Sequence, residues 1–296
     1  MKNILQYNYN INIKEINKIN DNYYFKHNQD SYIVAFYKRN DKEINNIYEL
    51  NKDMLAHNIP VFEIVKTNTN SVIFQYKNNK YILMKYPYIK NRIITYNDIL
   101  KFNYFPKNLN DIDKSNWSNL WETKIDHYES ISKEIKEKYL NKSLNYYIGL
   151  AENGISYFSN NFNGRLPKVI SHIRIGINTD LYEFLNPLNL IIDYKERDLG
   201  EYLKSYVLNS KYSKETINQM ISTKNNNRDS IIALICRILL PTYYFDEFDG
   251  IILNNKGNIN NIIEKRKNID HLIKSIFEKY SYLNLPYINW IIKTKG

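Results

Sequence analysis

The pattern of apolar and polar residues predicts a strand-rich first part of the chain. Runs of β-branched and aromatic residues that are bounded by polar residues are typical of β-strands. Five such runs lie at Asn22–His27, Ser31–Lys38, Val61–Thr67, Ser71–Lys77 and Lys80–Tyr86. We therefore expect a small, strand-rich lobe over residues 1–88.

Three local features refine this lobe. The dipeptide Asn78-Asn79 joins the last two runs, and Asn tolerates the left-handed backbone that a two-residue hairpin loop needs. Tyr9–Ile16 is a further candidate strand. From Ile44 to Leu55 apolar residues recur at three- and four-residue steps, which predicts a helix that is closed by Pro60. Strands, one helix and then more strands is the order of a kinase-type small lobe.

The rest of the chain, residues 89–296, has mostly helical periodicity and is expected to form a larger lobe. It begins with a connector that shows little periodicity. We predict helices over 115–135, Leu144–Phe162, Asp198–Val207, Ser213–Ile221, Asp229–Phe248, Ile262–Tyr280 and Ile288–Ile292. Pro241 is expected to bend or break the fifth of these helices. Asn-rich patches at Asn225–Asn227 and Asn254–Asn261 are expected to be loops.

Two short strand-like runs lie in the middle of the larger lobe. Lys168–His172 ends in a histidine and Leu188–Asp193 ends in an aspartate, and a helix start follows near Arg197. Asn178 lies between the two runs. Two strands that present His and Asp at their exits, with an Asn between them, form a frame that is common in phosphoryl transfer.

Composition narrows the class of protein. The chain has 296 residues, of which 43% are apolar, so it can bury a core and is globular. Its net charge is +10, but the excess is mostly Lys spread along the chain, and we favour a solvated Lys surface over a nucleic-acid-binding one.

The single cysteine, Cys236, is in an apolar run and is expected to be a buried, inert thiol. We find no signal peptide and no apolar span of about 20 residues, and therefore expect a protein that is soluble, contacts no membrane and is made in a reducing compartment.

Several separate stretches resemble one known family. They are LWETKIDHYE (Leu120–Glu129), YYIGLAENGISYF (Tyr146–Phe158), SHIRI (Ser171–Ile175), NPLNLIIDYKERDLGEYLK (Asn186–Lys204) and LLPTYYFDEFD (Leu239–Asp249). The chain thereby resembles the spore-coat-associated, kinase-like proteins of the YutH type, which are related to the CotS type and similar to aminoglycoside phosphotransferases and choline kinases. The resemblance implies an α+β, two-lobed protein-kinase-like fold with a strand-rich N-lobe and a mostly helical C-lobe.

The residues that carry phosphoryl transfer in such a fold are incomplete here. The family frame has His, any residue, Asp and then Asn, but here His172 is followed by Arg174 at the carboxylate position, and Asn178 is one residue closer than usual. A guanidinium stays charged and cannot act as a base. Asp193 matches the metal-binding Asp, yet the next Asp-Leu pair begins only five positions later, at Asp198. No glycine precedes Gly149, although a loop that covers phosphates usually needs glycine.

These observations lead to three hypotheses. We favour a non-catalytic kinase-like protein that acts in the structure or assembly of the bacterial spore coat, is made in the mother-cell cytoplasm, has other coat proteins as partners and needs no cofactor. The second hypothesis is an active small-molecule phosphotransferase that uses ATP and Mg²⁺. Its nucleotide would be bound by Lys38 and Glu49, its metal by Asp193, and Asp180 or Glu183 would replace the missing base. The third hypothesis is a basic nucleic-acid-binding protein.

Overall fold

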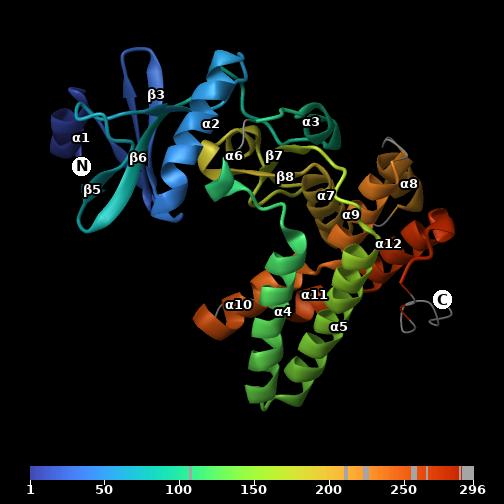
Figure 1. The fold of residues 1–296 in the computed structure, drawn as a ribbon. Coiled ribbons are helices and arrows are strands. Elements are labelled where there is room, and N and C mark those ends of the chain that lie inside the picture. The colour runs from blue at the N-terminus through green and yellow to red at the C-terminus, as the bar shows by residue number, and fades with distance from the viewer. Residues whose placement is uncertain are drawn as a thin grey trace. The chain divides into compact units, whose positions relative to one another are not determined.

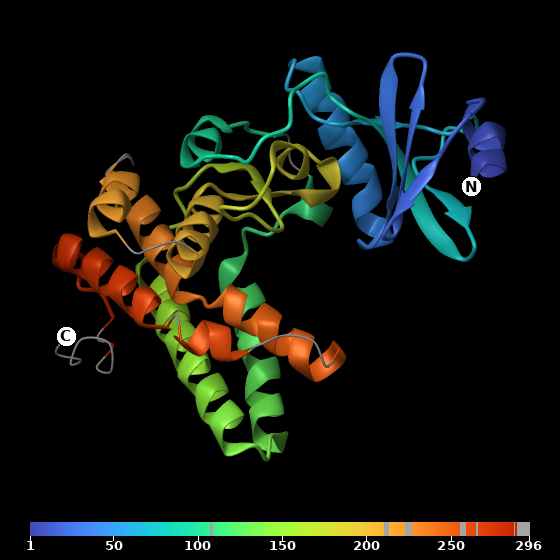
Figure 2. The ribbon, with the colours of Figure 1, turned by 180° about the vertical axis from the view of Figure 1, so that it is seen from behind.

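The chain folds into two compact units, which we describe separately. The computed structural model describes residues 1–106, 109–209, 213–222, 227–254, 259–264, 266–286 and 288. The strand-rich unit consists of Met1–Ile94, Tyr104–Asp113 and Thr179–Ile192. The helical unit consists of Thr95–Asn103, Lys114–Asn178 and Asp193–Gly296. Figures 1 and 2 show the sheet of the first unit in blue and cyan, and the helices of the second mostly in green to red.

The strand-rich unit contains an antiparallel sheet in the order β1-β2-β3-β6-β4, with β5 also paired to β6. Its strands are β1 (Asn17–Ile19), β2 (Asn22–His27), β3 (Asp30–Phe36), β4 (Glu63–Val65), β5 (Phe74–Tyr76) and β6 (Asn79–Lys85). All five predicted runs form strands, which confirms the prediction, and β1 was missed because three exposed residues give no apolar alternation.

Asparagine forms the tight turns of this sheet in place of glycine. The β5–β6 hairpin pairs Tyr76 with Asn79, so its two loop residues are Lys77 and Asn78, with φ of 50° and 63°. The turn thus lies one residue earlier than predicted. Asn20 and Asn28, with φ of 52° and 55°, serve the β1–β2 and β2–β3 hairpins in the same way.

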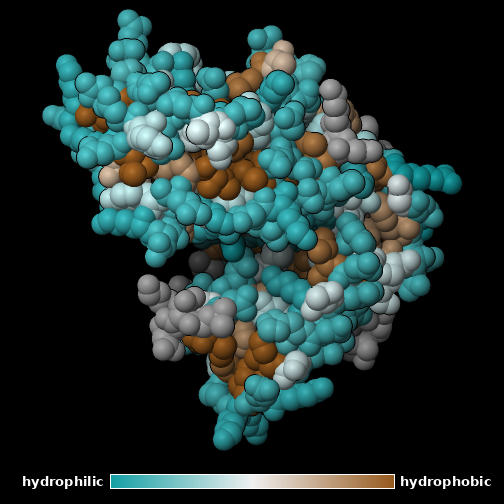
Figure 3. Space-filling model, turned by 60° about the vertical axis from the view of Figure 1, so that its left-hand side comes forward, coloured by the Kyte–Doolittle hydropathy of each residue, from teal (hydrophilic) through white to brown (hydrophobic). Residues whose placement is uncertain are grey.

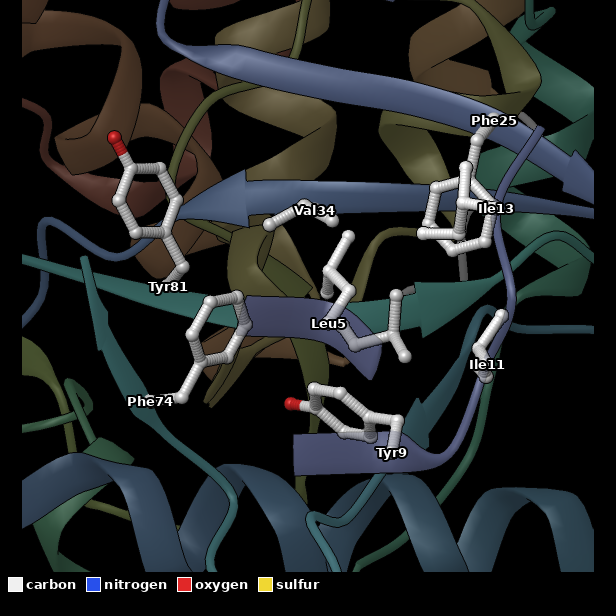
Figure 4. Close-up of a cluster of buried hydrophobic side chains, with 9 residues drawn as sticks. Leu5, Tyr9, Ile11, Ile13, Phe25, Val34, Phe74 and Tyr81 are labelled. Atoms are coloured by element: carbon white, nitrogen blue, oxygen red, sulfur yellow. The ribbon is translucent and has the colours of Figure 1, made fainter. Parts of the chain in front are cut away.

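The N-terminal segment is a helix followed by irregular chain, so the prediction of a strand at Tyr9–Ile16 was wrong. Helix α1 (Lys2–Tyr9) ends at Asn10, which has a left-handed φ of 55°. Ile11 and Ile13 alternate as in a strand because they bury their side chains, not because they join a ladder. Figure 4 shows these side chains gathered with those of neighbouring strands, and the whole buried cluster is Leu5, Tyr9, Ile11, Ile13, Phe25, Val34, Phe74, Tyr81 and Leu83.

The predicted small-lobe helix is α2 (Ile44–Ala56), preceded by the short 3-10 helix η1 (Asp41–Glu43). Its apolar stripe is buried, and Asn51 inside that stripe is 1% exposed. The Asn51 amide donates to the Phe62 carbonyl at 2.6 Å and accepts from the Ile64 backbone N–H at 2.9 Å. Asn51 therefore ties α2 to β4.

The strand-rich unit is discontinuous in sequence, whereas the predicted division at residue 88 was contiguous. Residues 179–192 join this unit, with helix α6 (Leu181–Phe184) and the 3-10 helix η3 (Pro187–Asn189), and residues 104–113 add η2 (Asn110–Ile112). The Leu181 backbone N–H donates to the Arg92 carbonyl at 2.7 Å. The Arg39 guanidinium donates to the Leu188 and Leu190 carbonyls at 3.2 and 2.7 Å. Such hydrogen bonds couple segments far apart in sequence, which periodicity cannot reveal.

The helical unit is built around a long antiparallel helix pair, α4 (Trp117–Glu134) and α5 (Lys138–Asn161), which lie side by side in Figures 1 and 2. Trp117 and Trp121 on α4 anchor the core, because they are 1% and 4% exposed and their rings stack with centroids 4.7 Å apart. Helix α5 is continuous through Gly154. A Cβ at Gly154 would lie 3.0 Å from the Leu239 Cβ, so this glycine permits close packing of another helix.

The remaining helices complete this unit. They are α3 (Tyr96–Lys101), α7 (Glu196–Asn209), α8 (Lys214–Ser222), α9 (Arg228–Leu239), α10 (Thr242–Asn254), α11 (Ile259–Glu264) and α12 (Arg266–Lys279), with a terminal 3-10 helix η4 (Ser281–Leu283). The break between α9 and α10 at Pro241 confirms the prediction, and Cys236 on α9 is buried as expected. The helix predicted over Ile262–Tyr280 is instead parts of α11 and α12. The predicted helix at Ile288–Ile292 and parts of the Asn-rich loops lie outside the described residues.

The face of the molecule that Figure 3 shows is mostly hydrophilic. Figure 3 shows brown, hydrophobic side chains as separate patches among teal ones. Within the described residues, no helix combines the length and the apolar character that crossing a membrane would require.

Candidate functional site

The two central strand-like runs form strands β7 (Lys168–His172) and β8 (Leu190–Tyr194), which pair as a two-stranded sheet. The first has the predicted bounds. Strand β8 starts two residues later than predicted, because Pro187 begins the 3-10 helix η3 before it. The Asn186 side chain caps η3 by accepting from the Leu188 N–H at 2.9 Å. Asp193, Tyr194 and the following α7 belong to the helical unit.

His172 is held in place by Asp198. Its side chain is buried, and Nδ1 lies 2.6 Å from Oδ2 of Asp198 in the first turn of α7. The other oxygen of Asp198 accepts from the His172 backbone N–H at 3.0 Å. Asp198 therefore fixes both the ring and the end of β7.

Asp193 is completely buried, and both its oxygens are engaged. Oδ1 accepts from the Trp117 indole N–H and from the Tyr194 backbone N–H, each at 2.7 Å. Oδ2 accepts from the Arg197 guanidinium at 3.1 Å. Burial raises the pKa of Asp193 to about 6, although Arg197 and Arg237 oppose the shift. The residue that sequence matching marks as the metal ligand is thus a buried structural acceptor for a tryptophan and an arginine.

Arg174 and Asn178 are exposed, whereas Asp193 is buried. The Arg174 guanidinium pairs with the Asp246 carboxylate on α10, and its side chain is 67% exposed. Asn178 is exposed as well. Arg174, in the chain after β7, is therefore paired with Asp246 on α10. No hydrogen bond or ion pair joins Asn178 to Asp193 in the described residues.

A buried charge network lies beside this frame, and the sequence reasoning missed it. Glu201 on α7 contacts the Lys204 ammonium at 2.9 Å and the Arg237 guanidinium at 2.7 Å. Lys204 is 1% exposed and also donates to three oxygens, the carbonyls of Arg237 and Leu240 and the hydroxyl of Thr242, at 2.7–3.0 Å. Burial alone would raise the pKa of Glu201, but Lys204 and Arg237 lower it to about 2. Burial lowers the pKa of Lys204 to about 8.

One signal in the sequence could have exposed this network. Gly200 lies inside the continuous helix α7, and a Cβ there would meet the Arg237 side chain at 2.8 Å. A glycine in a helix that otherwise has good periodicity indicates a close neighbour. The spacing of Glu201 and Lys204 on one face was also visible, but Arg237 is too distant in sequence to be assigned to them.

The proposed nucleotide pair does not form within the strand-rich unit. Lys38 lies beyond the end of β3, pairs with Asp21 at 3.0 Å, and both side chains are mostly exposed. Glu49 is exposed on α2. The close ion pair here is Arg39 with Glu43, at 2.6 Å and nearly buried, which the sequence reasoning missed. Asp180, a candidate replacement base, caps α6 by accepting from the Glu183 N–H at 2.8 Å.

The sequence pattern of the family "Spore coat putative kinase YutH" matches residues 2–283. The chain belongs to this family. A curated member, the endospore coat-associated protein YutH of Bacillus subtilis, is 21% identical over 290 residues, covering 87% of this chain and 85% of that protein.

Solved structures show the same fold. An aminoglycoside phosphotransferase from Alicyclobacillus acidocaldarius has a TM-score of 0.62 at 9% identity, with 93% of this chain and 95% of that chain covered. The choline kinase LicA from Streptococcus pneumoniae has a TM-score of 0.56 at 11% identity, with 94% and 97% covered. The chain of this YutH family member therefore has the aminoglycoside phosphotransferase-like kinase fold, as the sequence resemblance implied.

In this family member the fold's central strands carry side chains that are already paired with one another. Among the described residues, no group of three or more His, Cys, Asp or Glu side chains is arranged to hold a metal ion. The arrangement can hold charge in a fixed buried geometry, and it places cations, not a free carboxylate, beside the end of β7.

Proposed function

We propose that this protein is a non-catalytic, kinase-like component of the endospore coat, with a structural or assembly role and other coat proteins as partners. The coat assignment is supported by the family and by its Bacillus subtilis relative, the endospore coat-associated protein YutH. On this proposal the protein is made in the mother cell and gathers on the forming spore.

The state of Asp193 is the observation that supports the loss of catalysis. A carboxylate that binds Mg²⁺ for phosphoryl transfer must offer oxygen lone pairs to the ion. The Asp193 oxygens instead accept from Trp117, Tyr194 and Arg197, and the side chain has no exposed surface. Arg174 adds a permanent cation at the position that the resemblance gives to the base. We therefore expect neither ATP nor Mg²⁺ to be a working cofactor.

Turnover of ATP is the direct test of this proposal. Purified protein is incubated with ATP and Mg²⁺, with choline or spectinomycin as acceptor, and the release of ADP is measured. We expect ADP release equal to that of an Asp193→Asn variant prepared in parallel, which controls for contaminating ATPases. Release that exceeds the variant's by tenfold or more would show an active phosphotransferase and refute the proposal.

Cellular position tests the coat assignment separately. A fluorescent fusion expressed in a spore-forming host is expected to collect around the developing spore. A signal that stays diffuse throughout the mother cell would contradict a coat role, whatever the ATP assay shows.

A further inference from the structure

The helical unit contains a pocket that is lined by five cationic side chains. Its volume is about 440 Å³, which lies in the range of small-molecule sites. The cations are Lys124, Arg174, Arg197, Lys204 and Arg237. They come from α4, α7, α9 and the chain after β7, so the fold gathers charges that are scattered in sequence.

The carboxylates around this pocket are fewer than the cations. Asp246 and Glu201 line it, and Asp193 lies behind it against Arg197. Asp246 pairs with Arg174, and Glu201 is shared between Lys204 and Arg237. Two carboxylates line the pocket, and Asp193 and Asp249 act on Arg197 and Lys124 from outside its lining, so the five cations outnumber the carboxylates.

Lys124 is one source of this excess. It is partly buried and makes no ion pair with any carboxylate in the described part of the chain. Its ammonium lies 5.9 Å from the ring centre of Tyr128 and 5.5 Å from that of Phe245. Burial lowers the pKa of Lys124, whereas Asp246 and Asp249 act on it through space in the opposite direction. Asp249 itself accepts a hydrogen bond from the Tyr128 hydroxyl at 2.8 Å. A partly desolvated cation of this kind is stabilised by an anion placed next to it.

Arg237 is the second source. It is 3% exposed and lies 5.8 Å above the Trp117 ring and 5.9 Å above the Trp121 ring. A guanidinium has five N–H donors, and Glu201 is the carboxylate that Arg237 contacts in the described residues, through Nε. Because the guanidinium lines the pocket, its remaining donors are suited to two oxygens of one anionic group.

We propose that this pocket binds a compact organic dianion, bearing either a phosphate or two carboxylates, between Lys124 and the Arg237 guanidinium. Lys124 and the Arg237 guanidinium offer two cationic contacts to one dianion, and the volume admits a small metabolite but not a folded partner. The inference goes beyond the coat role, and it does not depend on whether the protein turns over ATP. The exposed Arg174 adds a guanidinium at the same pocket, so it is expected to contribute to recognition.

Calorimetric titration and thermal unfolding test this site on the full-length protein. The probes are inorganic phosphate and succinate, each compared with chloride and acetate at the same ionic strength. We expect at least one dianion to bind and to raise the melting temperature, while the monovalent ions do neither. The two probes distinguish a phosphate site from a dicarboxylate site. Failure of both to bind above chloride would overturn the proposal.

Matched variants locate the bound anion. Lys124→Gln removes a pocket charge, whereas Lys133→Gln removes an exposed charge from the same helix. We expect Lys124→Gln to weaken binding of the dianion roughly tenfold, as is typical of one lost charge contact, and Lys133→Gln to leave it unchanged. Arg174→Gln, at an exposed side chain, provides a second pocket variant that is not expected to disturb folding. Equal losses in Lys124→Gln and Lys133→Gln would mean that the anion responds to net charge alone, which would refute a defined site.

Discussion

A surface ion pair of the strand-rich unit and a buried charge network of the helical unit hold charge in opposite ways. In the strand-rich unit, the Lys38–Asp21 pair lies at the surface, with side chains 67% and 60% exposed. In the helical unit, Lys204 and Arg237 are almost completely buried around Glu201, whose side chain is 15% exposed. An exposed pair is screened and free to rearrange, whereas a buried group of charges keeps its geometry only if each member is paired. Fixed electrostatic function is therefore expected where the charges are buried and paired, as they are around Glu201.

Removing the carboxylate at the centre of the helical unit should have the largest effect. In Glu201→Gln, Lys204 and Arg237 lose the carboxylate that they share, and breaking a buried ion pair costs about 3–5 kcal/mol. We expect the free energy of unfolding, measured by urea titration, to fall by that amount. Glu122→Gln, at an exposed position on α4 of the same unit, serves as the control. Similar losses in both variants would contradict the difference between buried and exposed charge.

The pH dependence of Asp193 sharpens the same comparison. Its pKa is raised from 3.8 to about 6 in the folded protein, so the folded state holds the proton more tightly than the unfolded state. The stabilisation from this group is present at low pH and is lost as the pH rises from about 4 through about 6. A shift of this size corresponds to roughly 3 kcal/mol. We expect the unfolding free energy of the natural protein to decline relative to that of Asp193→Asn between pH 4.5 and 7. A constant difference across this interval would show that Asp193 is not titrating as proposed.

How much of the fold could be predicted from the sequence depends on how far apart in the chain the interacting residues lie. The strands around β6, helix α2 and the break at Pro241 follow from local periodicity and were predicted. The strand at Tyr9–Ile16 was not real, since alternation there reflects burial against the sheet, and burial and strand pairing produce the same pattern.

The site shows the same limit. His172, Arg174 and Asp193 could be identified by matching a motif along the chain. The carboxylate that holds His172 is Asp198, on the next helix, and the charge shared by Arg237 and Glu201 joins positions 36 residues apart, which no local pattern reveals.

The hairpin turns of the strand-rich unit give a smaller, purely local effect. Asn78 has a φ of 63°, where a residue with an ordinary side chain costs about 1 kcal/mol and glycine costs nothing sterically. We expect Asn78→Ala to lower the free energy of unfolding by about 1 kcal/mol. The free energy of unfolding of Asn78→Gly should stay within a few tenths of a kcal/mol of that of the natural protein. The two variants are compared by thermal unfolding. Equal stability of both would mean that the turn relaxes out of the left-handed conformation.

The exposed Lys38–Asp21 pair should have the smallest effect. Asp21→Asn removes its charge at a solvated position, and such pairs contribute about 0–1 kcal/mol, less at high salt. We expect a change below about 0.5 kcal/mol at 150 mM salt, measured alongside Glu201→Gln. A loss comparable to that of Glu201→Gln would erase the contrast between this exposed pair and the buried network around Glu201.

The single thiol of the chain can report local opening of the helical unit in these experiments. Cys236 has no exposed surface, and burial raises the pKa of its thiol well above the usual value, so an alkylating reagent should modify it only during moments when α9 comes away from its neighbours. The rate of alkylation then counts such openings directly, and any compound that tightens the helices around α9 should slow the reaction in proportion to its concentration.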